Sequence, residues 1–314
     1  MQKFLRRLDG WQRKRPFVSF VFAVIKKAGD DQLGYQAALI TYYGFLALFP
    51  LLLVATTVLQ IVLYRDQHLQ TQVLNSINQY LPMIGRDLQN NIHGFGKSGL
   101  ALIVGTIIAL YGARGVANAL QNGLNHIWQV PRVQRPGFPK NLATSFGLLL
   151  GNLGFVLAAV LSGLAAGLGR SFIFTAISIL ISLIILFGTF MYIFKAGTVS
   201  MVARRRHNYL SALGAALGLQ VLQLIGGFVL NHELTRLDGL YGTFAVVLGL
   251  LFWLYLQVQV VLYSVEITAV RRVKLWPRSI VRENLTPQDL RAYGLAASRE
   301  QLHPDVKIYT KIAK

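Results

Sequence analysis

Long apolar segments, separated by short polar stretches, dominate this chain of 314 residues. A helix needs about 20 residues, at 1.5 Å per residue, to cross the roughly 30 Å hydrocarbon core of a bilayer. Inside hydrocarbon every backbone N–H and C=O group must be bonded internally, so a segment of this kind forms an α-helix. We expect six spans, at about residues 35–64, 99–120, 142–168, 172–194, 210–230 and 241–270.

The composition supports a membrane bundle and excludes an ordinary soluble domain. Hydrophobic residues make up 54% of the chain and charged residues 14%, with a mean hydropathy of +0.49. Soluble domains carry about 25% charged residues. We therefore predict an all-α integral membrane protein, with a bundle of about six transmembrane helices in residues 35–272. Residues 1–34 precede the bundle, and a polar tail at residues 273–314 follows it.

The positions of Lys and Arg predict the orientation. The chain has 31 Lys and Arg residues against 12 Asp and Glu, a net charge of +19. They collect at both ends and in alternate loops rather than in one patch, which favours topogenic signals over a nucleic-acid surface. Because positively charged loops stay in the cytoplasm, we expect a multi-pass protein of a bacterial inner (cytoplasmic) membrane with both termini cytoplasmic.

The two ends of the chain carry their own predictions. Residues 17–33 are expected to form an amphipathic helix in the plane of the membrane interface. Its apolar residues recur at helical spacing: Phe17, Phe20, Val21, Val24 and Ile25. The tail after Val273 is expected to be a small cytosolic extension or partly disordered.

Two ionisable residues lie inside predicted spans, where charges are costly and mark candidate functional sites. Arg114 lies about sixteen residues into the second span, and Glu266 lies near the end of the sixth. Both spans run inward, so both residues fall in the cytoplasmic third of the bilayer and can pair. In the first span Pro50 removes one backbone hydrogen bond and predicts a helix break.

Other polar residues lie at a similar depth and predict a cavity open to the cytoplasm. The expected lining is Arg114, Asn118 and Asn122 of the second span, Gln259 and Glu266 of the sixth, and Thr41 and Tyr42 of the first. Two alternatives stay open. An Arg–Glu pair can serve only to fix helix register, and Arg114 can extend toward the lipid headgroups.

No catalytic or metal-binding pattern is found in the sequence. The chain has no cysteine, and none of its six histidines has metal-ligand spacing with another. It has neither a Walker A loop nor a GxSxG elbow. We therefore expect a protein that is not an enzyme and holds no metal or cofactor.

Three groups of residues resemble the YihY/virulence factor BrkB family. Residues 37–53 (AALITYYGFLALFPLLL) are similar to its first-span signature, and Arg114 with residues 124–128 (LNHIW) to its second motif. Residues 251–255 (LFWLY) and Glu266 resemble its last span. One departure is Ser264-Val265-Glu266, where the family usually has Gly-Ala-Glu.

The resemblance implies a six-helix inner-membrane protein. Family members have carried a ribonuclease label and have been discussed as transporters or envelope factors. The scattered acids of this chain do not form the metal-binding cluster that phosphodiester cleavage needs. We expect transport or flipping of a lipid or a small anionic amphiphile, with a non-catalytic scaffold for envelope assembly as the alternative and an intramembrane enzyme as a weaker one. The expected partners are membrane lipids, including anionic ones, and a second copy of the chain, but no nucleic acid.

Overall fold

The computed structural model describes residues 2–62, 99–137, 140, 143–145, 147–148, 172–199, 205–241, 243–281, 284–306 and 308. All regular elements of these parts of the chain are helices, in agreement with the predicted all-α class. Most of the predicted third span, residues 142–168, lies outside the described residues, as does the polar stretch between the first two predicted spans.

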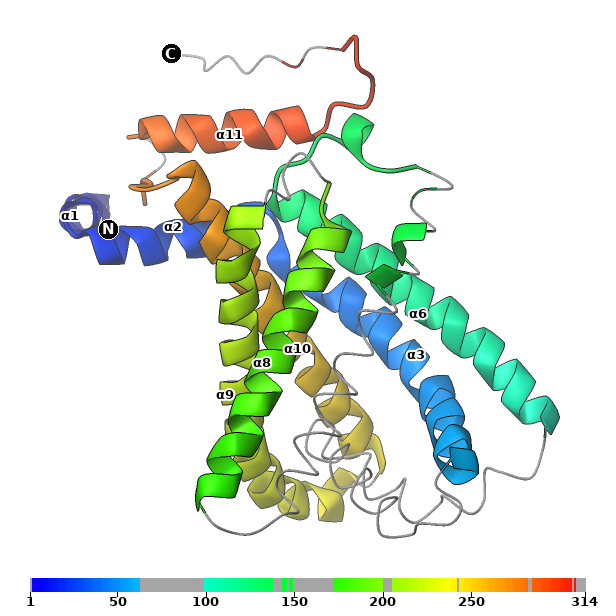
Figure 1. Cartoon of the computed structure of the whole chain (residues 1–314). Helices are drawn as coiled ribbons and strands as arrows, with labels where there is room; N and C mark the ends of the chain where they lie inside the picture. Colours follow the sequence, from blue (N-terminus) through cyan, green and yellow to red (C-terminus); the bar gives the residue numbers. More distant parts are fainter. Residues whose placement is uncertain are drawn as a thin grey trace.

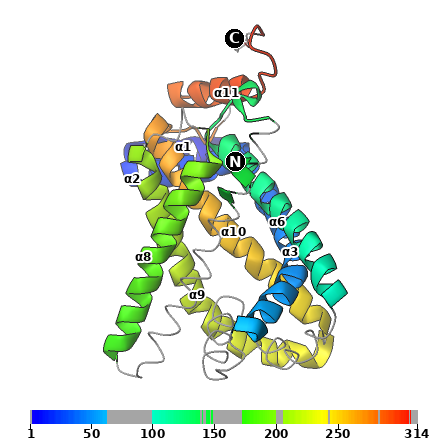
Figure 2. The same cartoon turned by 45° about the vertical axis from the view of Figure 1, so that its right-hand side comes forward.

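The long helices extend from one end of the molecule and spread apart toward the other (Figures 1 and 2). They are α3 (Leu33–Val62), α6 (Gly99–Ile127), α8 (Phe172–Gly197), α9 (Arg205–Tyr241) and α10 (Thr243–Val273). Among the described residues, three segments are long and apolar enough to cross a membrane: Thr175–Gly197, Asn208–Gly226 and Val247–Val273. They occupy α8, α9 and α10, and their 19 to 27 residues match the thickness of a bilayer core.

Several helices extend beyond the predicted spans. The predicted second span ends near residue 120, but α6 continues to Ile127, and α9 continues to Tyr241. An apolar pattern marks the part of a helix that hydrocarbon surrounds, whereas its backbone bonding can continue into polar surroundings. Pro50 lies inside α3, whose helix runs on to Val62, so the structure has no helix end at this proline.

Glycines allow α9 to lie close to α10. A Cβ atom added to Gly218 would lie 2.5 Å from Cγ1 of Val260, and one added to Gly214 would lie 3.2 Å from Cβ of Ser264. The four-residue spacing places both glycines on one face of α9, as in other close helix contacts in membranes. The tight approach beside Ser264 therefore uses a glycine of the facing helix, although α10 has no glycine at this position.

The pair formed by α3 and α6 uses the same device. A Cβ atom on Gly112 would lie 2.9 Å from that of Ala47, and one on Gly115 would lie against the ring of Tyr43. Helix α10 packs on α3 and α6 as well as on α9, so it joins the two halves of the bundle.

Helices α1 (Gln2–Lys14), α2 (Pro16–Asp30) and α11 (Pro287–Arg299) lie across one end of the long helices (Figures 1 and 2). We call these three helices, with residues 274–281, the terminal layer. The apolar spacing predicts a helix in α2 but not in α1, and the sequence of the tail predicts no fold for it. Hydrogen bonds join the two chain ends, because Gln12 Nε2 donates to the carbonyl oxygen of Arg278 at 2.6 Å.

Asp289 organises the start of α11. Its carboxylate accepts from the backbone N–H of Thr286, whose hydroxyl in turn accepts from the N–H of Asp289, which completes a capping box. The same carboxylate binds Lys26 Nζ at 2.9 Å and Arg278 Nε at 2.9 Å. Burial alone would raise the pKa of Asp289, but the hydrogen bonds from Lys26, Ser279 and Thr286 outweigh it and hold this pKa well below its ordinary value.

Replacing Gly218 by Ala is expected to lower the melting temperature of the detergent-purified protein. The added methyl overpacks the contact with Val260, a change that costs about 1–3 kcal/mol. The matched control is Gly188→Ala on α8, where the added atom meets nothing within 4 Å. In a Val260→Ala background the Gly218→Ala change is expected to cost much less. An equal loss in both backgrounds would contradict the close α9–α10 contact.

Candidate functional site

A buried ion cluster lies where the terminal layer meets the long helices. The ammonium group of Lys27 donates to Asp31 Oδ2 at 2.5 Å, to Glu266 Oε2 at 2.7 Å and to the carbonyl oxygen of Ile127 at 2.9 Å. All three of its protons therefore have an acceptor. The side chain of Glu266 has no exposed area, and those of Lys27 and Asp31 are 4% and 2% exposed.

Each partner comes from a different helix end. Lys27 lies on the buried face of α2, in its last turn, and Asp31 follows one turn later. Glu266 lies near the end of α10, while Ile127 is the last residue of α6. The last carbonyls of a helix lack intrahelical partners and carry partial negative charge, so the end of α6 suits a buried cation.

Arg299 of α11 closes the cluster from the outer side. Its Nη1 donates to Asp31 Oδ1 at 3.2 Å and to His126 Nε2 at 2.7 Å. Gln129 Nε2 donates to the same Asp31 oxygen at 2.6 Å. The cluster thus pairs two cations with two carboxylates, and this balance removes most of the cost of burying charge.

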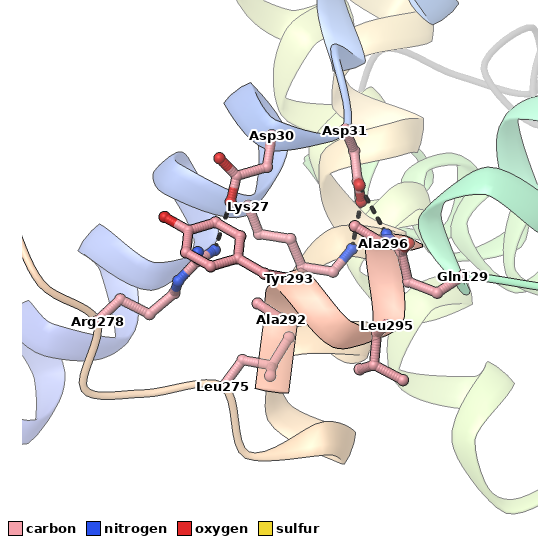
Figure 3. A pocket seen from close by; sticks show the side chains of 10 residues that line it. All are labelled: Lys27, Asp30, Asp31, Gln129, Leu275, Arg278, Ala292, Tyr293, Leu295 and Ala296. Atoms are coloured by element: carbon pink, nitrogen blue, oxygen red, sulfur yellow. Dashed lines mark hydrogen bonds and ion pairs between the residues drawn. The ribbon is translucent and has the colours of Figure 1, made fainter. Parts of the chain in front are cut away.

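A small pocket opens beside the cluster, between α2 and α11 (Figure 3). It measures about 290 Å³ including its open mouth, and Lys27, Asp31, Arg278 and Tyr293 are among its lining residues. Arg278 donates to Asp30 Oδ2 at 2.7 Å on one side of the pocket. In the described part of the chain, Oε1 of Glu266 is a buried oxygen without a hydrogen-bond partner.

The surroundings shift the pKa values of Lys27 and His126. Burial by itself lowers the pKa of Lys27, but the carboxylates of Glu266 and Asp31 raise it more, so the net shift is upward and the ammonium stays charged. Burial, followed by the charge of Arg299, lowers the pKa of His126 to about 4. His126 is therefore neutral at pH 7 and accepts the hydrogen bond from Arg299.

The structure places Glu266 at the centre of the site but gives it a different partner from the predicted one. The ion pair of Glu266 is with Lys27, not with Arg114. Arg114 points outward from α6, where its side chain is exposed. The sequence predicts how deep a residue lies along its helix, but it does not predict the rotation of that helix about its own axis.

The other predicted cavity residues do not gather around the pocket of Figure 3. Asn118 and Asn122 are exposed, as is Tyr42 of α3. Thr41 is buried and donates to the carbonyl oxygen of Ala37 at 2.8 Å. Gln259 is half-buried and donates to the hydroxyl of Tyr255 at 2.7 Å.

Arg114, Asn118 and Asn122 instead form an exposed polar stripe along α6. They recur every four residues, and the same exposed face continues toward the start of α6 with the side chains of Ile107 and Tyr111. The contact of Gly115 with Tyr43 places Arg114 at the level of Tyr42 and Tyr43 on α3. One face of α6 is thus apolar along its first half and polar along its second.

Sequence reasoning missed most members of the cluster. Lys27 and Asp31 are four residues apart, a spacing that brings oppositely charged side chains together on a helix. That pattern could have marked them as a pair. The capping sequence Thr286-Pro287-Gln288-Asp289 could likewise have predicted the start of α11. Nothing local in the sequence indicates that Arg299 reaches His126, because 173 positions separate them.

No group of three or more His, Asp or Glu residues that could hold a metal ion is found within the residues that the structure describes. The cluster itself is filled by the ammonium group of Lys27, which occupies the space between its carboxylates.

Comparison with known proteins relates most of the chain to one family. A family model described as Virulence factor BrkB matches residues 24–279. Among curated proteins, a UPF0761 membrane protein of Chromohalobacter salexigens is 28% identical over 243 residues, which cover 74% of this chain. A UPF0761 membrane protein of Delftia acidovorans is 27% identical over 262 residues, or 76% of this chain.

These relatives are longer than this chain. The matched regions span 58% of the Chromohalobacter protein and 59% of the Delftia protein. A third relative, a UPF0761 membrane protein of Neisseria meningitidis serogroup B, is 26% identical, with 85% of this chain and 66% of the relative covered. No solved structure matches the chain significantly.

Replacing Lys27 by Met is expected to destabilise the protein by about 3–5 kcal/mol, because it leaves the buried carboxylate of Glu266 without its cation and Asp31 with Arg299 alone. Thermal unfolding in detergent measures the loss. Lys195→Met, at an exposed position of α8, is the matched control and should change little. Adding Glu266→Gln to Lys27→Met should recover part of the lost stability. A double variant no more stable than Lys27→Met would argue against the pairing.

Lowering the pH from 6.5 toward 4 is expected to loosen α11. The folded pKa of His126, about 4, lies below its ordinary value of 6.5. The folded state therefore binds fewer protons, and stability falls as pH decreases through this window. Hydrogen exchange of α11 amides, corrected for intrinsic rates, measures the effect. His126→Gln should remove this part of the pH dependence, and an unchanged profile would rule out His126 as its source.

Proposed function

This chain belongs to the Virulence factor BrkB family, and on that premise we propose that it moves an amphiphile with an anionic headgroup across or within the membrane. The exposed polar stripe of α6 carries the proposal. Arg114, Asn118 and Asn122 face outward from a long helix whose first half exposes apolar residues. Polar residues that face hydrocarbon are costly, so such a stripe suits a path for a headgroup.

The chemistry of the stripe favours a phosphate or carboxylate headgroup. The guanidinium of Arg114 offers a planar set of donors that suits an anion, and the neighbouring amides can donate or accept. The amphiphile's tails would stay in hydrocarbon while its headgroup follows α6. The same arrangement would also let Arg114 bind a headgroup that stays in place. The test must therefore measure movement of the lipid and not binding alone.

The buried ion cluster has a separate role in this proposal. It holds the ends of α2, α6 and α10 together, so it stabilises the end of the bundle toward which the stripe leads. Because its charges are balanced, we assign the cluster a structural role in holding these helix ends together. None of its residues is assigned a catalytic role. A change in the spacing of α6 and α10 at this end would have to move Lys27 away from Ile127 or Glu266.

The proposal also includes the topology. The chain crosses a bacterial inner membrane about six times, and the terminal layer lies in the cytoplasm with both ends of the chain. The many Lys and Arg residues at the two ends support this orientation. Membrane lipids, including anionic ones, are the proposed partners, and no cofactor takes part.

The test places fluorescent phosphatidylglycerol in the outer leaflet of proteoliposomes. Its movement to the inner leaflet is measured as protection of the fluorophore from a membrane-impermeant reductant. The wild-type protein is expected to speed the exchange between leaflets. Arg114→Gln should slow it roughly tenfold, as expected for the loss of a charge-assisted hydrogen bond. Arg114→Lys should retain part of the rate. Arg271→Gln removes a charge at an exposed position of α10 and is the matched control.

Two outcomes would count against this function. Exchange no faster than in protein-free liposomes, for both phosphatidylglycerol and phosphatidylethanolamine probes, would refute lipid movement. An equal rate for Arg114→Gln and wild type would refute the role of the stripe. Co-purification of a stoichiometric envelope protein together with absent lipid exchange would favour the alternative, a non-catalytic scaffold.

A further inference from the structure

Helix α1 carries its polar face inward. Asp9 and Gln12 are 5% and 3% exposed. Oδ1 of Asp9 accepts from the backbone N–H of Ile280 at 2.8 Å, and Arg13 donates to the carbonyl oxygen of Asn284 at 2.8 Å. Polar bonds to the C-terminal segment therefore hold this helix in place, where an ordinary surface helix would use an apolar stripe.

Three large apolar residues of α1 lie on the outer side. Phe4, Leu8 and Trp11 are 65%, 37% and 48% exposed. Their spacing of four and then three residues places them on one face of the helix. A helix that turns such a face away from the protein is stable only if another apolar medium or surface covers it.

Helix α2 shows a second stripe of the same kind. Phe17, Val21 and Ile25 recur every four residues and are exposed. The opposite side of α2 is buried, where Ala23 and Val24 pack with Val270 and Leu275. We call Phe4, Leu8, Trp11, Phe17, Val21 and Ile25 the outer face of the two helices.

The position of α2 indicates what covers this outer face. The apolar segment of α10 ends at Val273, and α2 packs on α10 at Val270, three residues before that end. Trp276 lies edge-on to Phe20 at 5.2 Å at the same level. The end of an apolar span is the level of the membrane–water interface, where tryptophan is also enriched.

The charge of α1 selects the lipid. Residues 2–15 contain six Lys and Arg residues and one acid, Asp9. Arg7 and Lys14 are exposed and seven residues apart, so they flank the apolar stripe on the same side. Arg15 lies over the ring of Trp11 at 4.7 Å. Apolar residues flanked by such cations match a bilayer surface with anionic headgroups.

We propose that the outer face of α1 and α2 is a docking surface for the anionic phospholipid headgroups of the leaflet next to the terminal layer. The apolar side chains enter the boundary between headgroups and acyl chains, and Arg7 and Lys14 bind the phosphates. Because α1 is bonded to Arg278, Ile280 and Asn284, this docking also sets the position of the C-terminal segment relative to the membrane. The surface is independent of any lipid movement along α6.

The test uses the absence of cysteine from the chain. Full-length Leu8→Cys and Gly10→Cys variants are spin-labelled and placed in nanodiscs of phosphatidylcholine with or without phosphatidylglycerol. Gly10 is the matched control, because it lies on the same helix at an exposed position with open space around it. Accessibility to oxygen, which enters lipid, is compared with accessibility to a water-soluble nickel complex.

With phosphatidylglycerol present, the Leu8 label is expected to be accessible to oxygen and protected from nickel, and the Gly10 label to show the reverse. Arg7→Gln with Lys14→Gln should lower the ratio of protected to exposed label at a fixed phosphatidylglycerol content, by on the order of fivefold for each charge. Nickel access at Leu8 in both kinds of nanodisc would overturn the proposal. So would protection that needs no phosphatidylglycerol, or an immobile label shielded from both reagents, which would indicate a protein partner.

Discussion

The buried ammonium group of Lys27 needs three acceptors, and this requirement connects four parts of the chain. Asp31 follows the helix that carries Lys27, Ile127 ends α6, and Glu266 belongs to α10. Asp31 in turn binds Arg299 of α11. A buried charge that lost its partners would cost several kcal/mol, so these elements keep their positions together. The terminal layer is therefore part of the folded bundle.

This arrangement separates the polar groups of the protein into two sets with different surroundings. The cluster around Lys27 is buried and nearly fully bonded, as expected for groups that hold helices in place. The stripe of Arg114, Asn118 and Asn122 is exposed along α6, as expected for groups that meet a ligand or a lipid. The two sets share α6, whose last carbonyl belongs to the cluster. Changes at the cluster can therefore alter the position of the stripe.

The sequence indicated that a charge is buried within the bundle, but not the direction in which a helix face turns. Glu266 was expected to need a partner inside the bundle, and it has one in Lys27. Arg114 was the wrong partner, because it faces outward. The sequence pattern shows that Arg114, Asn118 and Asn122 share one face of α6, but it does not show whether that face turns inward or outward. The structure itself shows the face of α9 that meets α10, because Gly214 and Gly218 share that face and lie against α10.

The sequence by itself determined the helical class and the membrane environment, because backbone groups surrounded by hydrocarbon have few other ways to satisfy their hydrogen bonds. Only the tertiary structure decided that Lys27 reaches Glu266 across 239 positions, and that α1 turns its polar face inward. Local periodicity reports the surroundings of one helix at a time. Ion pairs between distant segments depend on how the helices pack, which no single segment encodes.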